Sequence, residues 1–93
     1  MSIVRINEFQ SAEGNQAALF EFLKSLLPYI IQSEGCISCE VLRNNEVEGS
    51  FVVIEKWQSK EFHQQSIANF PKEDMQAAMS LFSAPPKGSY YSE

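Results

Sequence analysis

Residues 2–9, SIVRINEF, alternate in character and are rich in β-branched side chains. Alternation with a period of two is typical of a β-strand, in which successive side chains point to opposite faces of the sheet. The two faces of this predicted strand are formed by Ile3, Arg5, Asn7 and Phe9 on one side and by Val4, Ile6 and Glu8 on the other.

Residues 15–35 change to a helical period. Apolar residues recur there at spacings of three and four, which predicts a helix with one broad apolar stripe: Leu19, Phe20, Leu23, Leu26, Leu27, Ile30 and Ile31. Asn15 is a plausible N-cap and Gly35 a plausible C-terminal stop. Pro28 lies inside the pattern and removes one backbone hydrogen bond, so we expect a kink near residues 24–28.

The second half of the chain predicts two strands, two helices and a last short strand. Residues 36–44 and 50–57 are strands joined by a polar hairpin, and the second is apolar on both faces until Glu55. Residues 59–70 form a helix with Ser59 as its N-cap, and Pro71 suits the first turn of a helix over 71–82. The inner face of that last helix is expected to consist of Met75, Ala78, Met79 and Phe82. Residues 89–93, SYYSE, form a weak final strand.

This order, β-α-β-β-α-(α)-β, is that of an α+β protein with the ferredoxin-like split βαβ arrangement, an antiparallel sheet with its helices on one face. The chain is expected to form a single domain over residues 1–93. The first and third strands carry apolar residues on both faces, and an exposed apolar sheet face would promote aggregation. A homodimer with sheet packed against sheet is the simplest arrangement that covers this face.

Composition excludes several classes of function. The net charge is −5 and the seven Lys and Arg are scattered, which argues against nucleic acid because a phosphate-binding face needs clustered positive charge. No apolar run approaches the roughly 20 residues that span a membrane. The N-terminus shows no signal-peptide pattern, so the expected location is the cytoplasm.

The only two cysteines, Cys36 and Cys39, have the C-x-x-C spacing of redox pairs and zinc sites. An odd separation along one strand places the side chains on opposite faces. Their Cα atoms would lie about 10 Å apart at ~3.3 Å per residue, which is too far for a disulfide. Zinc needs four ligands, and only His63 remains as a further soft ligand. We therefore expect packing cysteines and no metal site.

Two stretches, EGCISCEVLR and SFVVIEKWQSKEF, resemble the antibiotic biosynthesis monooxygenase family. Members of that family have a Gly-Cys pair that opens the second strand, a Glu-x-Trp that ends the third, and a helix directly after that Trp. Pro28, eight residues before Cys36, also resembles members such as the bacterial quinol monooxygenase. The similarity extends over nearly the whole chain, although each motif is short.

The resemblance implies a dimeric α+β barrel. Many members oxidise quinols or polycyclic phenols with dioxygen and no bound cofactor, and the sequence contains no G-x-G-x-x-G, Walker or metal-ligand motif. The expected function is therefore that of a cofactor-independent monooxygenase acting on a quinol-like or phenolic small molecule. The alternative is a non-catalytic ligand-binding or assembly module on the same dimeric fold.

Three polar residues on predicted strands are candidates for the catalytic groups. The Asn7 amide could stabilise a developing oxyanion in a dry pocket, or simply bond to its neighbours. Arg5 shares its face and could hold an enolate or form a salt bridge. Glu55 could act as a base if burial raises its pKa, or could be a structural carboxylate.

Apolar residues from several elements could line a substrate cavity between the helices and the sheet, or could equally be a filled core: Phe20, Leu23, Phe62, Met75, Met79 and Phe82. Trp57 is either a packing anchor or part of the substrate site. Tyr90 and Tyr91 close one end of the pocket or cover the sheet edge. Ser66 joins the predicted substrate site because it stands where many family members carry a histidine, nine residues after the strand Trp.

His63 is the single histidine, and we expect it on the surface of its helix, with Phe62 as the residue that points inward. Haem-degrading relatives use a strand Asn, a helix Trp and an axial His. Asn7 matches the first, but Ser66 and Gln76 stand at the other two positions. Since the iron ligand is missing, we exclude haem as the substrate.

Overall fold

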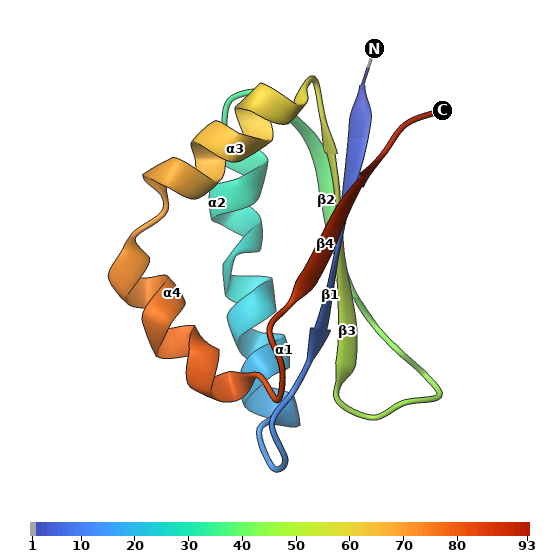
Figure 1. The fold of residues 1–93 in the computed structure, drawn as a ribbon, viewed down its shortest axis with the longest axis vertical. Coiled ribbons are helices and arrows are strands. Elements are labelled where there is room, and N and C mark those ends of the chain that lie inside the picture. The colour runs from blue at the N-terminus through green and yellow to red at the C-terminus, as the bar shows by residue number, and fades with distance from the viewer. Residues whose placement is uncertain (1) are drawn as a thin grey trace.

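A computed structural model describes residues 2–93, which form an antiparallel sheet with a layer of helices on one face (Figure 1). The elements follow in the order β1 (Ile3–Gln10), α1 (Gln16–Ser25), α2 (Leu27–Gln32), β2 (Cys36–Arg43), β3 (Ser50–Trp57), α3 (Lys60–Asn69), α4 (Lys72–Ala78), the 3₁₀ turn η1 (Met79–Leu81) and β4 (Lys87–Tyr91). The four strands are arranged β2-β3-β1-β4. The predicted ferredoxin-like α+β fold is confirmed.

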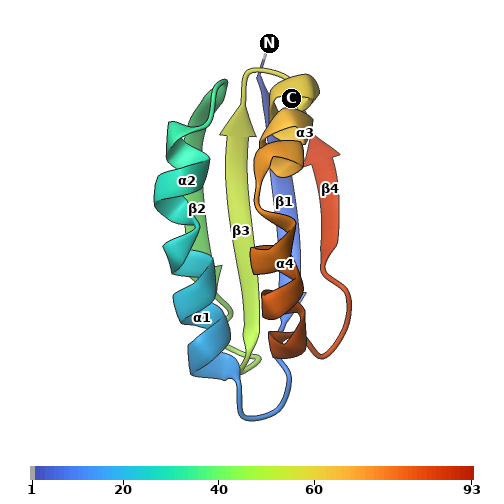
Figure 2. The same cartoon turned by 90° about the vertical axis from the view of Figure 1, so that its left-hand side faces the viewer.

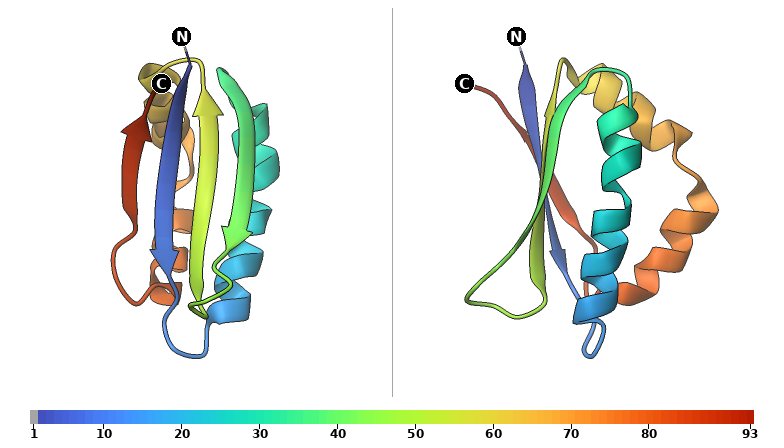
Figure 3. Two further views of the ribbon diagram at one scale, coloured as in Figure 1. Left: turned by 90° about the vertical axis from the view of Figure 1, so that its right-hand side faces the viewer. Right: turned by 180° about the vertical axis from the view of Figure 1, so that it is seen from behind.

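The helices form two columns over the sheet. Figure 2 shows α1 and α2 in line over the β2 side and α3 and α4 in line over the β1 and β4 side. The two strands that the chain makes first and third, β1 and β3, lie in the middle of the sheet, and the first and last residues of the described chain lie at the same end (Figure 1). Residues 2–93 place no helix on the opposite face of the sheet (Figure 3, left).

Pro28 divides the predicted first helix as expected. The helix α1 ends at Ser25, and α2 begins at Leu27 with the proline in its first turn, where the missing N–H has no helical partner to lose. Asn15 occupies the N-cap position of α1 without a side-chain hydrogen bond. At the start of α3, Ser59 caps as predicted, because its side chain accepts a hydrogen bond from the Phe62 N–H.

The core lies between α1 and the middle of the sheet. Leu19 and Leu23 are fully buried against Phe51 and Val53 of β3. The Phe20 ring stacks on Phe51 with 5.4 Å between the ring centres. The helix-facing residues of β3 are therefore its odd-numbered ones, and this parity fixes which face every paired strand presents to the helices.

The predicted inner face of the last helix is wrong for two of its four residues. Ala78 is buried, but Met75 is 41% and Met79 is 61% exposed. The α-helix ends at Ala78 and the chain tightens into the 3₁₀ turn η1. A 3₁₀ turn has fewer residues per turn than an α-helix, so the 3.6-residue period no longer assigns the face of Met79, and it is Leu81 that packs against the core cluster.

The prediction that Cys36 and Cys39 lie on opposite faces of the sheet is wrong. Cys36 pairs with Trp57 and Cys39 with Glu55, so three residues of β2 lie opposite two of β3, with a bulge between Cys36 and Ser38. A bulge inserts one unpaired residue and reverses the parity of a strand. Both cysteines therefore lie on the helix-facing side rather than on opposite faces, and Cys39 packs against the core cluster.

Leu23→Ala should lower the free energy of unfolding by about 2–5 kcal/mol, because it removes a fully buried side chain from the core. Chemical denaturation monitored by circular dichroism measures the change. The control is Ile31→Ala, on the same helical column but 54% exposed. We expect this substitution to change the free energy of unfolding by no more than about 0.5 kcal/mol, as is usual for surface positions. Equal effects of the two substitutions would contradict the described core.

Candidate functional site

Polar side chains of the two central strands meet on the helix-facing side of the sheet, at the end where the chain begins. Arg5 pairs with Glu55 across β1 and β3, and Asn7 stands two residues further along the same face of β1. Arg5 Nε donates a hydrogen bond to Asn7 Oδ1 at 3.0 Å, and Asn7 Nδ2 donates one to Glu55 Oε2 at 3.1 Å. The three residues predicted as catalytic candidates therefore form one connected chain.

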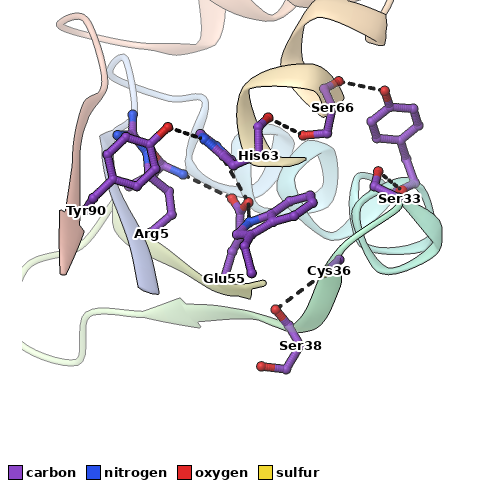
Figure 4. A network of polar contacts seen from close by, with 11 residues as sticks. Arg5, Ser33, Cys36, Ser38, Glu55, His63, Ser66 and Tyr90 are labelled. Atoms are coloured by element: carbon purple, nitrogen blue, oxygen red, sulfur yellow. Dashed lines mark hydrogen bonds and ion pairs between the residues drawn. The ribbon is translucent and has the colours of Figure 1, made fainter. Parts of the chain in front are cut away.

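Glu55 is the centre of this network (Figure 4). Its side chain is almost completely buried, and its other oxygen, Oε1, accepts a hydrogen bond from Trp57 Nε1 at 2.9 Å. Burial raises the pKa of Glu55, while the hydrogen bonds from Trp57 and Asn7 and the nearby Arg5 act in the opposite direction. The carboxyl group is thus held by two neutral donors and lies close to one cation.

His63 also belongs to this network, and the prediction that it lies on the surface is wrong. Only 3% of His63 is exposed, and its Nε2 lies 3.9 Å from Glu55 Oε1. The ring meets the Trp57 ring edge to face, with 5.5 Å between the centres. Phe62, which we expected to point inward, is half-buried and packs over Gly35. The error arose because the inward face of α3 is polar, whereas its apolar residues mark the outer side.

Tyr90 closes the network from the edge strand β4. Its hydroxyl oxygen lies 2.6 Å from His63 Nδ1, and its ring meets the His63 ring edge to face. The Arg5 guanidinium carbon lies 4.6 Å from the centre of the Tyr90 ring. Because Glu55 can only accept when ionised, the consistent arrangement has the Nε2 proton facing Glu55 and the Tyr90 hydroxyl donating to Nδ1.

Burial, together with the positive charge of Arg5, lowers the pKa of His63 to about 4. His63 is therefore neutral at pH 7, and its contact with Glu55 is not an ion pair there. A neutral imidazole between a carboxyl group and a phenol can accept a proton on the phenol side when the Glu55 carboxylate offsets the cost that burial and Arg5 place on the resulting cation.

This protonation state can be measured directly because His63 is the only histidine. We expect its ring signals in an NMR titration to shift with a midpoint near a pKa of about 4 rather than the ordinary 6.5. Since the folded-state pKa is depressed, His63 contributes stability that is fully present above pH 6.5 and is lost as the pH falls toward 4. A midpoint near 6.5 would show that the imidazole is exposed to solvent.

The network reaches solvent on the β4 side, at Gly88. Asn7 pairs with Gly88 and Arg5 with Tyr90 across β1 and β4. A Cβ added at Gly88 would collide with the Arg5 guanidinium and with Asn7 Oδ1. Arg5 and Asn7 are half-buried and Gly88 is exposed. The absence of a side chain at Gly88 thus lets the Arg5 and Asn7 side chains lie directly over its backbone. We define the shelf as Arg5, Asn7, Gly88 and Tyr90, with Glu55 and His63 behind it.

Gly88→Ala should therefore break the hydrogen bonds that connect Arg5, Asn7 and Glu55. The new methyl group forces the Arg5 and Asn7 side chains away, which should weaken any reaction at Glu55 by the ~10²-fold typical for loss of one positioned donor. Steady-state turnover measures the change. The matched control is Ser89→Ala, on the next residue and the opposite sheet face, which should keep wild-type turnover. Wild-type activity in Gly88→Ala would remove Asn7 and Arg5 from the site.

The apolar residues predicted to line a substrate cavity are not gathered in one place. Leu23 and Trp57 are fully buried, Phe20 packs on Phe51, and Phe82 packs on Phe9 with 5.6 Å between ring centres. Met79 faces solvent, for the reason given above. Two pockets of residues 2–93 lie between the helices, and of that predicted set only Phe62 and Ser66 belong to their linings.

These two pockets lie between the columns α1–α2 and α3–α4. The first, of about 350 Å³, is lined by Tyr29, Gln32, Ser33, Glu34, Phe62, Gln65, Ser66 and Asn69. The second, of about 420 Å³, is lined by Phe22, Ser25, Leu26, Tyr29, Phe70, Asp74, Ala77, Ala78 and Leu81. Neither lining includes Glu55 or His63, so the pockets and the buried network are separate features of residues 2–93.

The cysteines have the properties of packing residues within the described chain. Burial, together with the nearby negative charge of Glu55, raises the pKa of Cys39 to about 12. Cys36 is half-buried and its Sγ lies 3.6 Å from the Ser38 carbonyl oxygen. Residues 2–93 contain no group of three or more His, Cys, Asp or Glu that could hold a metal ion. None of the helices in that part of the chain has the length and apolar character needed to cross a membrane.

The fold and a buried acid–base network on the helix-facing side of the sheet define a class of small α+β proteins, and comparisons identify the family. The family model for antibiotic biosynthesis monooxygenase matches residues 2–79, so the chain belongs to that family. The family suggested by the sequence is confirmed.

Several solved structures share the fold. A putative antibiotic biosynthesis monooxygenase from Nitrosomonas europaea has a TM-score of 0.90 at 15% identity, covering 99% of this chain and 89% of that one. Rv0793 from Mycobacterium tuberculosis has a TM-score of 0.87 at 16% identity, covering 100% and 95%. SnoaB, a cofactor-independent oxygenase from Streptomyces nogalater, has a TM-score of 0.81 at 15% identity, covering 99% and 92%. No curated protein matches the sequence.

Proposed function

We propose that this protein is a cofactor-independent monooxygenase that oxidises a quinol-like or phenolic compound with dioxygen. The observation that carries the proposal is the Tyr90–His63–Glu55 series, in which a half-buried phenol contacts a buried neutral imidazole that lies beside a buried carboxyl group. Membership of the family and the shared fold of SnoaB, a cofactor-independent oxygenase, support the same reaction class.

The proposed substrate lies on the shelf with its hydroxyl group toward Tyr90. The Tyr90 oxygen takes the phenolic proton while its own proton passes to His63 Nδ1, 2.6 Å away. The imidazolium that forms is stabilised by Glu55, whose Oε1 lies 3.9 Å from Nε2. Proton removal is the step that the protein must promote, because the phenolate is electron-rich enough to reduce dioxygen.

Arg5 and Asn7 have charge-binding roles in this proposal. One N–H of the Asn7 amide is already committed to Glu55, so its second N–H is the one left for an oxyanion. The Arg5 guanidinium over the Tyr90 ring places a positive charge beside the developing phenolate. Trp57 acts through Glu55 as a positioning residue, since it is fully buried.

The reaction balances without an external reductant. A phenol with a free para position loses its hydroxyl proton, gives one electron to dioxygen and recombines with the resulting superoxide at the para carbon to form a hydroperoxide. Breaking the O–O bond with loss of the para hydrogen gives a p-quinone and one water. One oxygen atom enters the product and the other leaves as water, so the substrate supplies all four electrons.

The second candidate function is a non-catalytic ligand-binding or assembly module. The observation that favours it is the closed interior, because Leu19, Leu23 and Trp57 have no exposed surface. A substrate cavity between α1 and the sheet would need these side chains to move. The cytoplasmic location expected from the sequence and the homodimer remain predictions under either function.

Oxygen consumption against a panel of quinols and phenols tests the proposed function. We expect at least one phenol or quinol to consume dioxygen above its uncatalysed rate, with a quinone as product. If every member of a panel from one to three rings reacts only at the uncatalysed rate, the binding module becomes the better account.

A further inference from the structure

The two pockets between the helix columns adjoin each other on the side of α3 away from the proposed reaction site. We call the two pockets together the seam. In Figure 4, Tyr90 and His63 lie to one side along α3, and Ser66 and Ser33 lie to the other. The Ser66 hydroxyl donates to the His63 carbonyl oxygen at 2.7 Å, so the helix backbone separates the seam from the imidazole. The proposed oxygenase reaction gives no role to this seam.

Tyr29 stands at the junction of the two pockets and lines both. Its hydroxyl donates a hydrogen bond to the Ser66 carbonyl oxygen at 2.7 Å, which spans the seam from α2 to α3. Its ring meets the Phe70 ring edge to face, with 5.2 Å between the centres. The pockets therefore adjoin across one fixed aromatic ring, on which a single ligand can lie.

The two ends of the seam differ in chemistry. The first pocket combines the face of Phe62 with the side-chain amides of Gln65 and Asn69 and the carboxylate of Glu34. An aromatic ring surrounded by amides and a carboxylate suits a hydroxyl-rich group, which needs both hydrogen-bond donors and acceptors. The second pocket is lined mainly by apolar side chains, including Phe22, and suits a hydrocarbon tail.

The negative charges in the two linings exclude amphiphiles with an anionic head group. Glu34 lines the first pocket and Asp74 the second, and the chain has a net charge of −5. No Lys or Arg belongs to either lining within residues 2–93. A fatty acid or a phosphate ester would therefore place an anion beside carboxylates with no cation to offset the repulsion. These carboxylates therefore exclude an anionic head group, and the side-chain amides of Gln65 and Asn69 favour an uncharged, hydroxylated one.

We propose that this seam is a binding site for a neutral amphiphile with a hydroxylated head and a hydrocarbon tail. The head occupies the pocket of Phe62 and Gln65, the tail occupies the pocket of Phe22 and Ala77, and the middle crosses the Tyr29 ring. The site is independent of the proposed oxygenase reaction, so it can be tested whether or not the protein turns over a phenol.

Isothermal titration calorimetry with n-alkyl β-glucosides, below their critical micelle concentrations, tests the site. We expect octyl glucoside to bind one to one and hexyl glucoside to bind roughly 15-fold more weakly, because each buried methylene contributes about fourfold in affinity. Sodium octanoate, which has a similar tail and a charged head, should bind at least about tenfold more weakly than octyl glucoside. Octanoate binding as tightly as octyl glucoside would overturn the assignment of a neutral head.

Two aromatic substitutions separate the seam from non-specific adsorption. Ala77→Phe fills the second pocket and should remove the difference between octyl and hexyl glucoside. The control is Met79→Phe, two residues away and 61% exposed, which should bind both like the wild type. Circular dichroism confirms that both variants are folded. Unchanged tail dependence in folded Ala77→Phe, or no saturable binding of octyl glucoside by the wild type, would overturn the proposal.

Discussion

Tyr90→Phe should lower turnover of the active phenol by about 10²–10⁴-fold, the range for loss of a positioned acid–base group. The substitution removes only the hydroxyl that contacts His63 Nδ1 at 2.6 Å. The phenyl ring that remains can keep its contacts with His63 and with the Arg5 guanidinium. The large loss should therefore fall on the reaction rate, while the free energy of unfolding drops by only about 1–3 kcal/mol because the buried His63 Nδ1 loses its partner.

Tyr91→Phe is the matched control, because it removes the same hydroxyl from the neighbouring residue. Tyr91 is 54% exposed and pairs with Val4, so its side chain lies on the helix-free face of the sheet. It should retain wild-type turnover. A Tyr90→Phe enzyme as fast as the Tyr91→Phe control would show that the substrate proton does not leave through Tyr90, and the relay to His63 would have to be abandoned.

The protein should sediment at micromolar concentration with about twice the mass of its chain. The face of the sheet that carries no helix (Figure 3, left) presents Val4, Ile6, Leu42, Val52, Ile54 and Tyr91. Leu42 is 45% exposed, and a contiguous apolar patch of this kind is uncommon on a monomer. We expect a second copy to cover it.

Ile54→Lys should convert this dimer to a monomer, because it places a charge in the middle of the apolar face with no partner. Ile31→Lys makes the same change on α2, where the side chain is 54% exposed and faces away from the sheet interface, and it should leave the dimer intact. Sedimentation velocity distinguishes these outcomes. A wild-type protein that sediments as a stable monomer would contradict sheet-to-sheet pairing.

The fold was predictable because its elements bury apolar residues at regular periods. The alternation of residues 2–9 predicted both faces of β1, and Pro28 predicted the break between α1 and α2. The prediction failed where the backbone departs from a regular period. The bulge after Cys36 reversed the parity of β2, and the 3₁₀ turn at Met79 turned that side chain to solvent.

The site was predictable only in part, for a related reason. Arg5, Asn7 and Glu55 stand out because they are polar residues at positions where a strand faces the core. His63 was misplaced because a polar residue on a short helix is normally exposed, and its burial depends on Tyr90 and Glu55, which are distant in sequence. The role of Gly88 follows from a contact across β1 and β4 that no local pattern encodes.

We propose that this chain inserts one atom of dioxygen into a phenol with its own side chains. The most direct measurement is turnover of the active phenol under ¹⁸O₂ by protein freed of metals and flavin, with mass spectrometry of the product. We expect a quinone that carries one ¹⁸O atom, with the second ¹⁸O recovered in water. An unlabelled quinone accompanied by hydrogen peroxide, or no turnover until a metal or flavin is restored, would contradict it.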